Sequence, residues 1–189
     1  GDKLQLSGKD ISTRINEGIG KLVAAVYYKL NYIDTATNEA SIRSLLKTSA
    51  QYQLTLSGGT PINKLALSDL EEYLNLNTTR NHSRTSLKTL YDRYMKAPYG
   101  FIEDDVRWLV AKLFRDGRVS MFVNNEPITM MSKSEEEIIR YLTKRDFTEK
   151  LLIEYREVTP EKHKKAVREV MRELFNFTPV DDEEDAMMN

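Results

Sequence analysis

The clearest pattern along the chain is a change of hydrophobic period near residue 117. Over residues 102–114, apolar side chains recur at offsets 0, 4, 7, 8, 11 and 12, which places them on one face of an amphipathic helix. After Asp116-Gly117, apolar and polar residues alternate over residues 119–123, as in a strand with one buried face. Asn124-Asn125 then supplies a tight turn, and residues 126–130 supply a return arm. The pattern predicts a helix that leads into a β-hairpin.

A second amphipathic helix precedes this unit. Its apolar residues between positions 87 and 94 share one face, and it must end before Pro98, because a proline disfavours helical geometry in the preceding residue. Tyr99-Gly100 supplies the turn between the two helices. Helix, turn, helix and hairpin in this order are typical of a winged-helix domain. Residues 80–130 are therefore predicted to form a winged-helix-like unit, with Pro127 restricting the return arm to an edge strand.

The first 79 residues are predicted to form a helical region with one short strand. Residues 10–32 have apolar side chains at spacings of three and four, which predicts one long helix with a buried stripe. Asp10 or Ser12 is the expected N-cap, since both side chains can accept a hydrogen bond from the first helical turn.

Three shorter elements follow in the same region. Residues 41–46 are predicted to form a short helix, and residues 52–56 alternate as a brief strand does. Ser68 is predicted to cap another helix, with Glu71 completing a capping box. The polar stretch 75–83 is the predicted linker to the winged-helix-like unit.

The last part of the chain divides into a folded segment and a tail. Residues 131–178 are predicted to form a helix, a strand and a final helix, with Ser132 or Ser134 capping the first. Residues 179–189 are predicted to be an acidic disordered tail. The fold class that results is α+β and mostly helical.

Composition excludes several classes of protein. The chain has 189 residues, 40% hydrophobic and 30% charged, which suits a globular protein with a packed core. It has no apolar run of membrane-spanning length, so no membrane partner is expected. The absence of cysteine removes disulfides and thiolate metal sites, and favours a cytoplasmic location. The net charge is −1, but five acids lie in the tail, so the rest of the chain carries +4.

Residues with catalytic potential are scarce. Gly18-Ile19-Gly20-Lys21 resembles part of a phosphate loop, but Ile15 and Leu22 stand where a glycine and a Ser or Thr are required. The two histidines, His82 and His163, lie in polar surroundings far apart in sequence. No paired carboxylates or activated nucleophile can be identified. We therefore predict no enzyme activity, no metal and no cofactor for this stretch of chain.

A binding role is better supported, because basic residues gather around the helix at 102–114. Residues 80–122 hold nine basic and five acidic side chains. The candidate residues for contacting nucleic acid or a partner are Arg84, Lys88, Arg107, Trp108, Lys112, Arg115 and Arg118. However, Glu103, Asp104 and Asp105 occupy the first turn, where a recognition helix meets base edges. Sequence-specific reading by this helix is not expected, and the structural alternative is a winged-helix-like scaffold in which Trp108 is partly buried against a neighbouring element or a partner.

Three stretches carry a resemblance to a known family: INEGIGKLVAAVYYKLNYID, APYGFIEDDVRWLVAKLFRDGRVSMFVNNEPI and LLIEYREVTPEKHKKAVREVMRELF. They resemble the region outside the nucleotide-binding core in the large P-loop ATPases of BREX phage-resistance systems, of the BrxC or PglY type. The matching positions are Pro98, Tyr99, Gly100, Phe101, Gly117, Pro127 and Ile128. The resemblance implies a non-catalytic module, with ATP bound elsewhere in the parent protein.

The first hypothesis is therefore an interaction module of a BREX-type ATPase. Its expected partners are the rest of the parent ATPase, other defence-system proteins, and DNA held without sequence specificity. The second hypothesis is a stand-alone winged-helix DNA-binding regulator. A small hydrolase is a third class of function, which no set of residues supports. The start at Gly1 instead of Met fits a piece of a longer protein or the remnant of a cleaved tag, and we favour the former.

Overall fold

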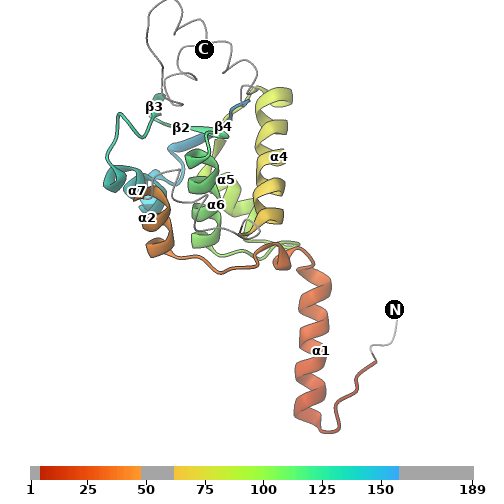
Figure 1. Ribbon diagram of the computed structural model, residues 1–189. Helices are drawn as coiled ribbons and strands as arrows, with labels where there is room; N and C mark the ends of the chain where they lie inside the picture. Colours follow the sequence, from red (N-terminus) through yellow and green to blue (C-terminus); the bar gives the residue numbers. More distant parts are fainter. Residues whose placement is uncertain (1–4, 48–61, 158–189) are drawn as a thin grey trace, which may run out of the picture. The chain divides into compact units, whose positions relative to one another are not determined.

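The computed structural model describes residues 5–47 and 62–157, whose arrangement is shown in Figure 1. Helices predominate and a small antiparallel sheet accompanies them, so the predicted α+β, mostly helical class is confirmed. The described residues up to Arg156 belong to one compact unit. The strand predicted at 52–56, the last predicted helix and the acidic tail lie outside the described residues.

Helix α1 spans Ile11–Val26. Its predicted cap is confirmed, because the Asp10 carboxylate accepts a hydrogen bond of 2.8 Å from the Thr13 backbone N–H. The predicted burial of its apolar stripe is wrong, since no residue of α1 is buried. The spacing identifies the apolar face of a helix but not whether another element covers it. Six apolar side chains are 40–78% exposed: Ile11, Ile15, Ile19, Leu22, Val23 and Val26.

The first helix also ends earlier than predicted. Tyr27 leaves helical geometry, with φ of −108° and ψ of 51°. The Lys29 backbone N–H then donates to the Pro98 carbonyl at 3.0 Å, and a short 3-10 helix, η1, spans Leu30–Tyr32. A contact with a residue far along the chain therefore replaces the helical hydrogen bond that the local sequence predicts.

Helix α2, Glu39–Lys47, confirms the short helix predicted there. The capping box predicted at Ser68 is wrong, because that residue lies inside helix α4. The residue before α4 is Asn63, whose side-chain oxygen accepts hydrogen bonds of 2.9 Å from the N–H groups of Asp34 and Thr35. Asn63 is fully buried and thus joins the start of α4 to the segment before α2.

Helix α4 spans Lys64–Asn81, so the linker predicted at 75–83 is helical over most of its length. The polar side chains in this stretch form contacts inside the fold. The Thr78 hydroxyl, for example, accepts a hydrogen bond of 3.0 Å from the Tyr155 backbone N–H. Polar composition alone predicts a loop here, because a partner such as Tyr155 of β4 is 77 positions away in sequence.

Helices α5, Leu87–Tyr94, and α6, Glu103–Arg115, confirm the two helices predicted for the winged-helix-like unit. Gly100 lies in the turn between them with φ of +71°, and a Cβ atom there would lie 2.7 Å from a ring carbon of Tyr27. Gly117 follows α6 with φ of +68°, the left-handed conformation that commonly ends a helix. The turn predicted at Gly100 is thus confirmed, and Gly117 ends α6.

The predicted hairpin is also confirmed. Strands β2, Val119–Val123, and β3, Glu126–Ile128, pair antiparallel. Asn124 and Asn125 connect them with φ of 53° and 65°, as a two-residue turn of the type favoured in hairpins requires. Strand β3 lies at the edge of the sheet, where Pro127 does not have to donate a hydrogen bond to a further strand.

Two further predicted elements follow the hairpin. Helix α7 spans Glu135–Thr143, with Ser134 as its cap and Glu137 completing a capping box. After the 3-10 helix η2, Arg145–Phe147, the chain enters strand β4, Leu151–Tyr155. The first helix and the strand predicted for this part of the chain are thus confirmed.

The sheet order is β1-β4-β2-β3, where β1 is the short strand Thr85–Ser86. Strand β4 therefore lies between β1 and β2, pairing antiparallel with both. Met121 of β2 faces Ile153 of β4 on one side and Ile128 of β3 on the other. Residues 124–150 thus form an excursion between two paired strands, and this excursion carries β3 and α7.

Candidate functional site

Helix α6 carries most of the candidate binding residues and is enclosed by other elements. Helices α2, α4, α5 and α7 and strand β2 all contact it, and Figure 1 shows α6 lying among these helices. No residue of α6 is more than partly exposed. Its buried residues occupy several faces: Asp105, Val106, Trp108, Leu109, Val110, Ala111 and Leu113. A helix that reads bases must enter the major groove with an open face, and α6 has none.

Trp108 does not lie on the polar face where the sequence placed it. Its side chain is only 6% exposed, so the assignment to the solvent face is wrong and the alternative of packing inside the fold is confirmed. The single apolar stripe of α6 predicts that the opposite face of the helix is exposed to solvent. The contacts of α6 with α2 and α7, which are distant in sequence, bury much of that face. An indole in this position has no surface on which to stack a base.

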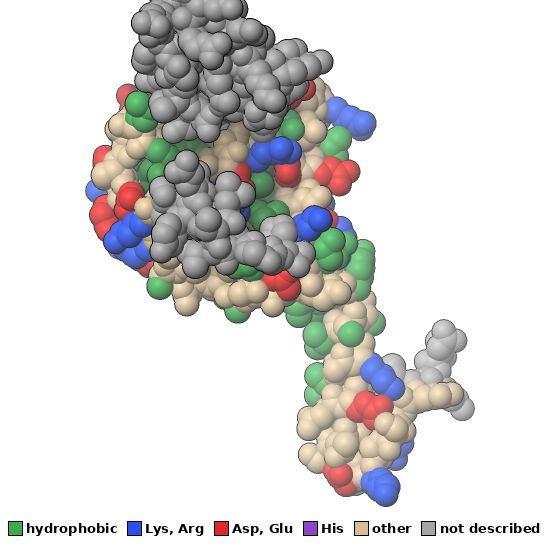
Figure 2. Space-filling model, viewed as in Figure 1, with side chains coloured by type: hydrophobic (Ala, Val, Ile, Leu, Met, Phe, Trp, Pro, Cys, Tyr) green, Lys and Arg blue, Asp and Glu red, His purple; other side chains and the backbone are tan. Residues whose placement is uncertain are grey.

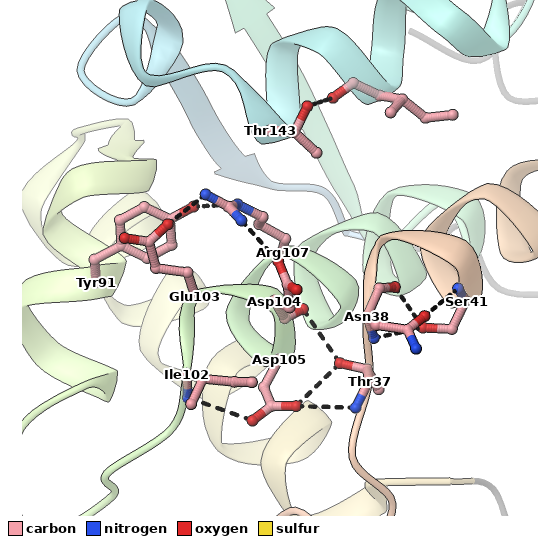
Figure 3. Close-up of polar contacts among 11 residues, drawn as sticks. Thr37, Asn38, Ser41, Tyr91, Ile102, Glu103, Asp104, Asp105, Arg107 and Thr143 are labelled. Atoms are coloured by element: carbon pink, nitrogen blue, oxygen red, sulfur yellow. Dashed lines mark hydrogen bonds and ion pairs between the residues drawn. The ribbon is translucent and has the colours of Figure 1, made fainter.

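Arg107 is the centre of a polar network shown in Figure 3. Its Nε donates to the Tyr91 hydroxyl at 2.8 Å, and its Nη1 donates to the Asp104 carboxylate at 2.7 Å. Its Nη2 forms an ion pair with Glu103. Burial raises the pKa of Tyr91 to about 12, although the charge of Arg107 opposes this shift. With a side chain only 14% exposed, Arg107 is committed to the fold.

The next two basic residues of α6 also have oxygen partners. The Lys112 ammonium lies 2.7 Å from the Asp116 carboxylate, one turn further along the helix. The Arg115 Nη1 donates at 2.8 Å to the carbonyl of Leu46, a residue in the last turn of α2. Arg115 therefore stabilises the C-terminal end of α2, where cations interact favourably with unpaired carbonyls.

The basic residues outside α6 are paired with acids from distant elements. Arg84 binds Glu154 of β4 at 3.0 Å, and its guanidinium lies 3.6 Å from the centre of the Phe122 ring. Arg118 forms an ion pair with Glu71 of α4. Lys88 binds Glu149 at 3.1 Å, with both side chains more than half exposed. Each of the six basic candidates therefore has an oxygen partner in the described structure.

The N-terminal end of α6 is occupied by the chain itself. One oxygen of the Asp105 carboxylate accepts hydrogen bonds from the Thr37 N–H at 3.2 Å and the Thr37 hydroxyl at 3.0 Å. The other accepts from the Ile102 N–H at 3.3 Å (Figure 3). Asp105 is 6% exposed. Of the three acids that were expected to repel phosphate, Asp105 thus closes the first turn and holds the segment before α2, whereas Glu103 and Asp104 pair with Arg107.

A second polar cluster, which is not among the sequence predictions, surrounds Asp69 of α4. The Lys29 ammonium lies 2.6 Å from its carboxylate, and the hydroxyls of Tyr94 and Tyr99 donate to it at 3.1 and 2.8 Å. Burial opposes ionisation of Asp69, but the hydrogen bonds from Lys29 and Tyr99 outweigh it and lower its pKa. The pKa of Lys29 is raised, mainly by the hydrogen bond to Asp69. The sequence signal that could have indicated this cluster is the concentration of tyrosines near Pro98, at Tyr91, Tyr94 and Tyr99.

The described residues contain no group of three or more His, Asp or Glu side chains arranged to hold a metal ion. Within the same ranges, no helix is both long and apolar enough to cross a membrane.

Comparison with known proteins gives one family. A family model described as the BREX ATP-binding protein BrxC winged helix-turn-helix domain matches residues 29–157. The match begins just after α1 and covers every described element from η1 to β4. No solved structure matches the chain.

Proposed function

Because this chain belongs to the family of BREX BrxC winged helix-turn-helix domains, we propose that it is a non-catalytic interaction module of a BREX ATPase. In this proposal, ATP is bound elsewhere in the parent protein, and this module contacts the rest of that protein and its partners in the defence system. The module does not read DNA sequence through α6. A winged-helix architecture does not decide this point, since one fold supports many functions.

The enclosure of α6 is the observation that carries the proposal. A recognition helix needs side chains that can leave the protein surface and reach base edges. In α6, Trp108 is buried and Arg107 is held by Tyr91, Glu103 and Asp104. Turning Arg107 outward would break its hydrogen bond with Tyr91 and its ion pairs with Glu103 and Asp104, and would move a side chain that is now only 14% exposed.

Charge balance supports the same conclusion. The candidate cations are matched by acids that lie outside the segment where they gather, including Glu71, Glu149 and Glu154. Phosphate binding is driven by unpaired positive charge that displaces counterions from DNA. A surface of paired charges supplies little of this driving force.

The exposed stripe of α1 favours contact with protein. Six of its apolar residues are at least 40% exposed, and Figure 2 shows part of the stripe as green side chains along this helix. Apolar residues repeated along one helix face commonly mark a surface that a partner covers. This helix precedes the stretch matched by the family.

Titration with duplex DNA at two ionic strengths tests the proposal. We expect binding no tighter than about 100 µM in physiological salt, the weak end of nonspecific binding. Lys112→Gln should leave that affinity unchanged, as should Lys133→Gln on the surface after β3. The proposal would be refuted by binding with a nanomolar dissociation constant that rises steeply with salt, if Lys112→Gln weakens this binding and Lys133→Gln does not. That result would favour a DNA-binding regulator.

A further inference from the structure

A surface hollow of about 580 Å³ lies beside the Asp69 cluster. We call it the Arg93 hollow. Residues from the segment after α1, from α4 and α5 and from the turn before α6 line it, and these include Tyr28, Lys29, Tyr73, Arg93, Lys96 and Tyr99. Both aromatic rings and cations thus line it.

Arg93 is oriented by its aromatic neighbours and not by an acid. Its guanidinium lies 4.3 Å from the centre of the Tyr73 ring, and its Nη2 donates to the Tyr99 hydroxyl at 3.1 Å. Among residues 5–47 and 62–157, no carboxylate forms an ion pair with it. This distinguishes Arg93 from Arg84, Arg107 and Arg118, each of which forms an ion pair with a carboxylate.

The carboxylates nearest to the hollow have other partners. Asp69 already accepts from Lys29, Tyr94 and Tyr99. Asp92 lies 3.4 Å from the Lys96 ammonium, in a pair whose side chains are 58% and 70% exposed. Such an exposed pair contributes little stability and can exchange partners at small cost. The hollow therefore presents one oriented guanidinium and one loosely held ammonium.

We propose that the Arg93 hollow binds the carboxylate of an Asp or Glu side chain on a partner protein. The inference rests on the proposed function and names the chemistry of the partner segment. A guanidinium can hold a carboxylate through two parallel hydrogen bonds, and stacking on Tyr73 fixes its plane before binding. Arginine and tyrosine are also the residues that most often dominate the binding energy of protein interfaces.

The ligand is a protein and not a nucleic acid, because the charge around the hollow is mixed. Three cations, Lys29, Arg93 and Lys96, lie close to two carboxylates, Asp69 and Asp92. A run of phosphates would meet Asp92, which lines the hollow beside the cations, whereas a single carboxylate needs to contact only Arg93 and Lys96. Tyr28, which is 63% exposed, offers an apolar surface for residues that flank the bound acid.

The test uses the full-length parent ATPase, purified together with the other proteins of its system. A carbodiimide, which joins amines directly to carboxylates, is applied and the products are mapped by mass spectrometry. We expect Lys96 to be joined to an Asp or Glu of another protein. Arg93→Gln should weaken binding of that protein about 30-fold, as expected for truncating one partner of a buried charge pair. Arg93→Lys should restore part of the affinity.

Arg80→Gln is the matched control, because Arg80 is an exposed arginine of the neighbouring helix α4 and lies outside the hollow. It should bind as the unmodified protein does. Urea unfolding of Arg93→Lys checks that the site remains folded. The proposal is overturned if Lys96 is joined only within its own chain and Arg93→Gln binds normally. It is also overturned if Arg93→Gln weakens binding of a 20-nucleotide single strand but not of protein.

Deleting residues 29–157 separates this inference from the proposed function. If the assembly forms equally well without them, the interaction role itself fails. If the deletion disrupts the assembly and Arg93→Gln does not, only the assignment of the Arg93 hollow fails.

Discussion

Removing the Asp105 carboxylate tests what holds α2 against α6. In Asp105→Ala, the N–H groups of Thr37 and Ile102, now 3.2 and 3.3 Å from the carboxylate, lose their acceptor. The Thr37 hydroxyl loses its 3.0 Å contact with the carboxylate and keeps the Asp104 carbonyl at 3.2 Å. Asp105 and Thr37 are 6% and 7% exposed, so water cannot easily replace the lost oxygens there. The N–H of Ile102 belongs to a residue that is 55% exposed and is more easily hydrated.

The magnitude follows from the two buried contacts with Thr37. A hydrogen bond to a charged group contributes about 1.5–3 kcal/mol, and a buried donor left unsatisfied costs about 1–3 kcal/mol. The bonds here are long and share one oxygen, so we expect Asp105→Ala to lower the free energy of unfolding by about 3 kcal/mol. Asp105→Asn keeps the volume and one acceptor, and we expect a loss of about 1 kcal/mol.

Urea unfolding followed by tryptophan fluorescence is the assay, because Trp108 is the single tryptophan and is buried. A loss of about 3 kcal/mol would also lower the melting temperature by roughly 6–12 °C for a domain of this size. Asp116→Asn is the control, since its ion pair with Lys112 is partly exposed and should contribute under about 1 kcal/mol. A Thr37→Val double-mutant cycle should show coupling above about 0.5 kcal/mol. If Asp105→Ala lowers the free energy of unfolding no more than Asp116→Asn does, the buried Asp105 carboxylate does not hold α2 against α6.

Two further predictions concern the junction between α1 and the winged-helix domain. Gly100→Ala should lower the melting temperature more than Gly117→Ala. Both glycines have positive φ, but only a Cβ atom at position 100 would meet Tyr27. Equal melting temperatures of the two variants would contradict this prediction. The lowered pKa of Asp69 means that its contribution is present above the unfolded value of 3.8 and is lost as pH falls through the folded value. Asp69→Asn should therefore lower the urea midpoint at pH 7 and flatten its decline below about pH 4, where an unchanged acid profile would contradict the prediction.

The sequence predicts the helices and strands from α5 to β4 well, because each is specified by local signals. Helix α6 has a continuous apolar stripe, Gly117 ends it, and Asn124-Asn125 closes a hairpin with a two-residue turn. Helix α7 carries its own capping box at Ser134. These features depend on residues no more than a few positions apart.

The errors arise where the decisive partner is distant in sequence. The start of α4 is set by Asn63, whose partners Asp34 and Thr35 lie 29 and 28 positions away. The apparent basic surface has the same origin, because Arg118 and Arg84 find their acids 47 and 70 positions away. Counting charges within a window of sequence therefore overstated the positive charge available to a ligand.

The sheet order explains why a domain with a winged-helix sequence has no open recognition helix. Strand β4 pairs with β1 and β2, so the chain between β2 and β4 must leave the sheet and return. The excursion formed by residues 124–150 uses that length to place α7 against α6 and α2. The surfaces that we propose for partners are the α1 stripe and the Arg93 hollow. These adjoin in the chain, since Val26 ends α1 and Tyr28 and Lys29 line the hollow. A partner that binds Arg93 would thus contact the residues that connect α1 to the domain, and would restrict how that helix can be placed.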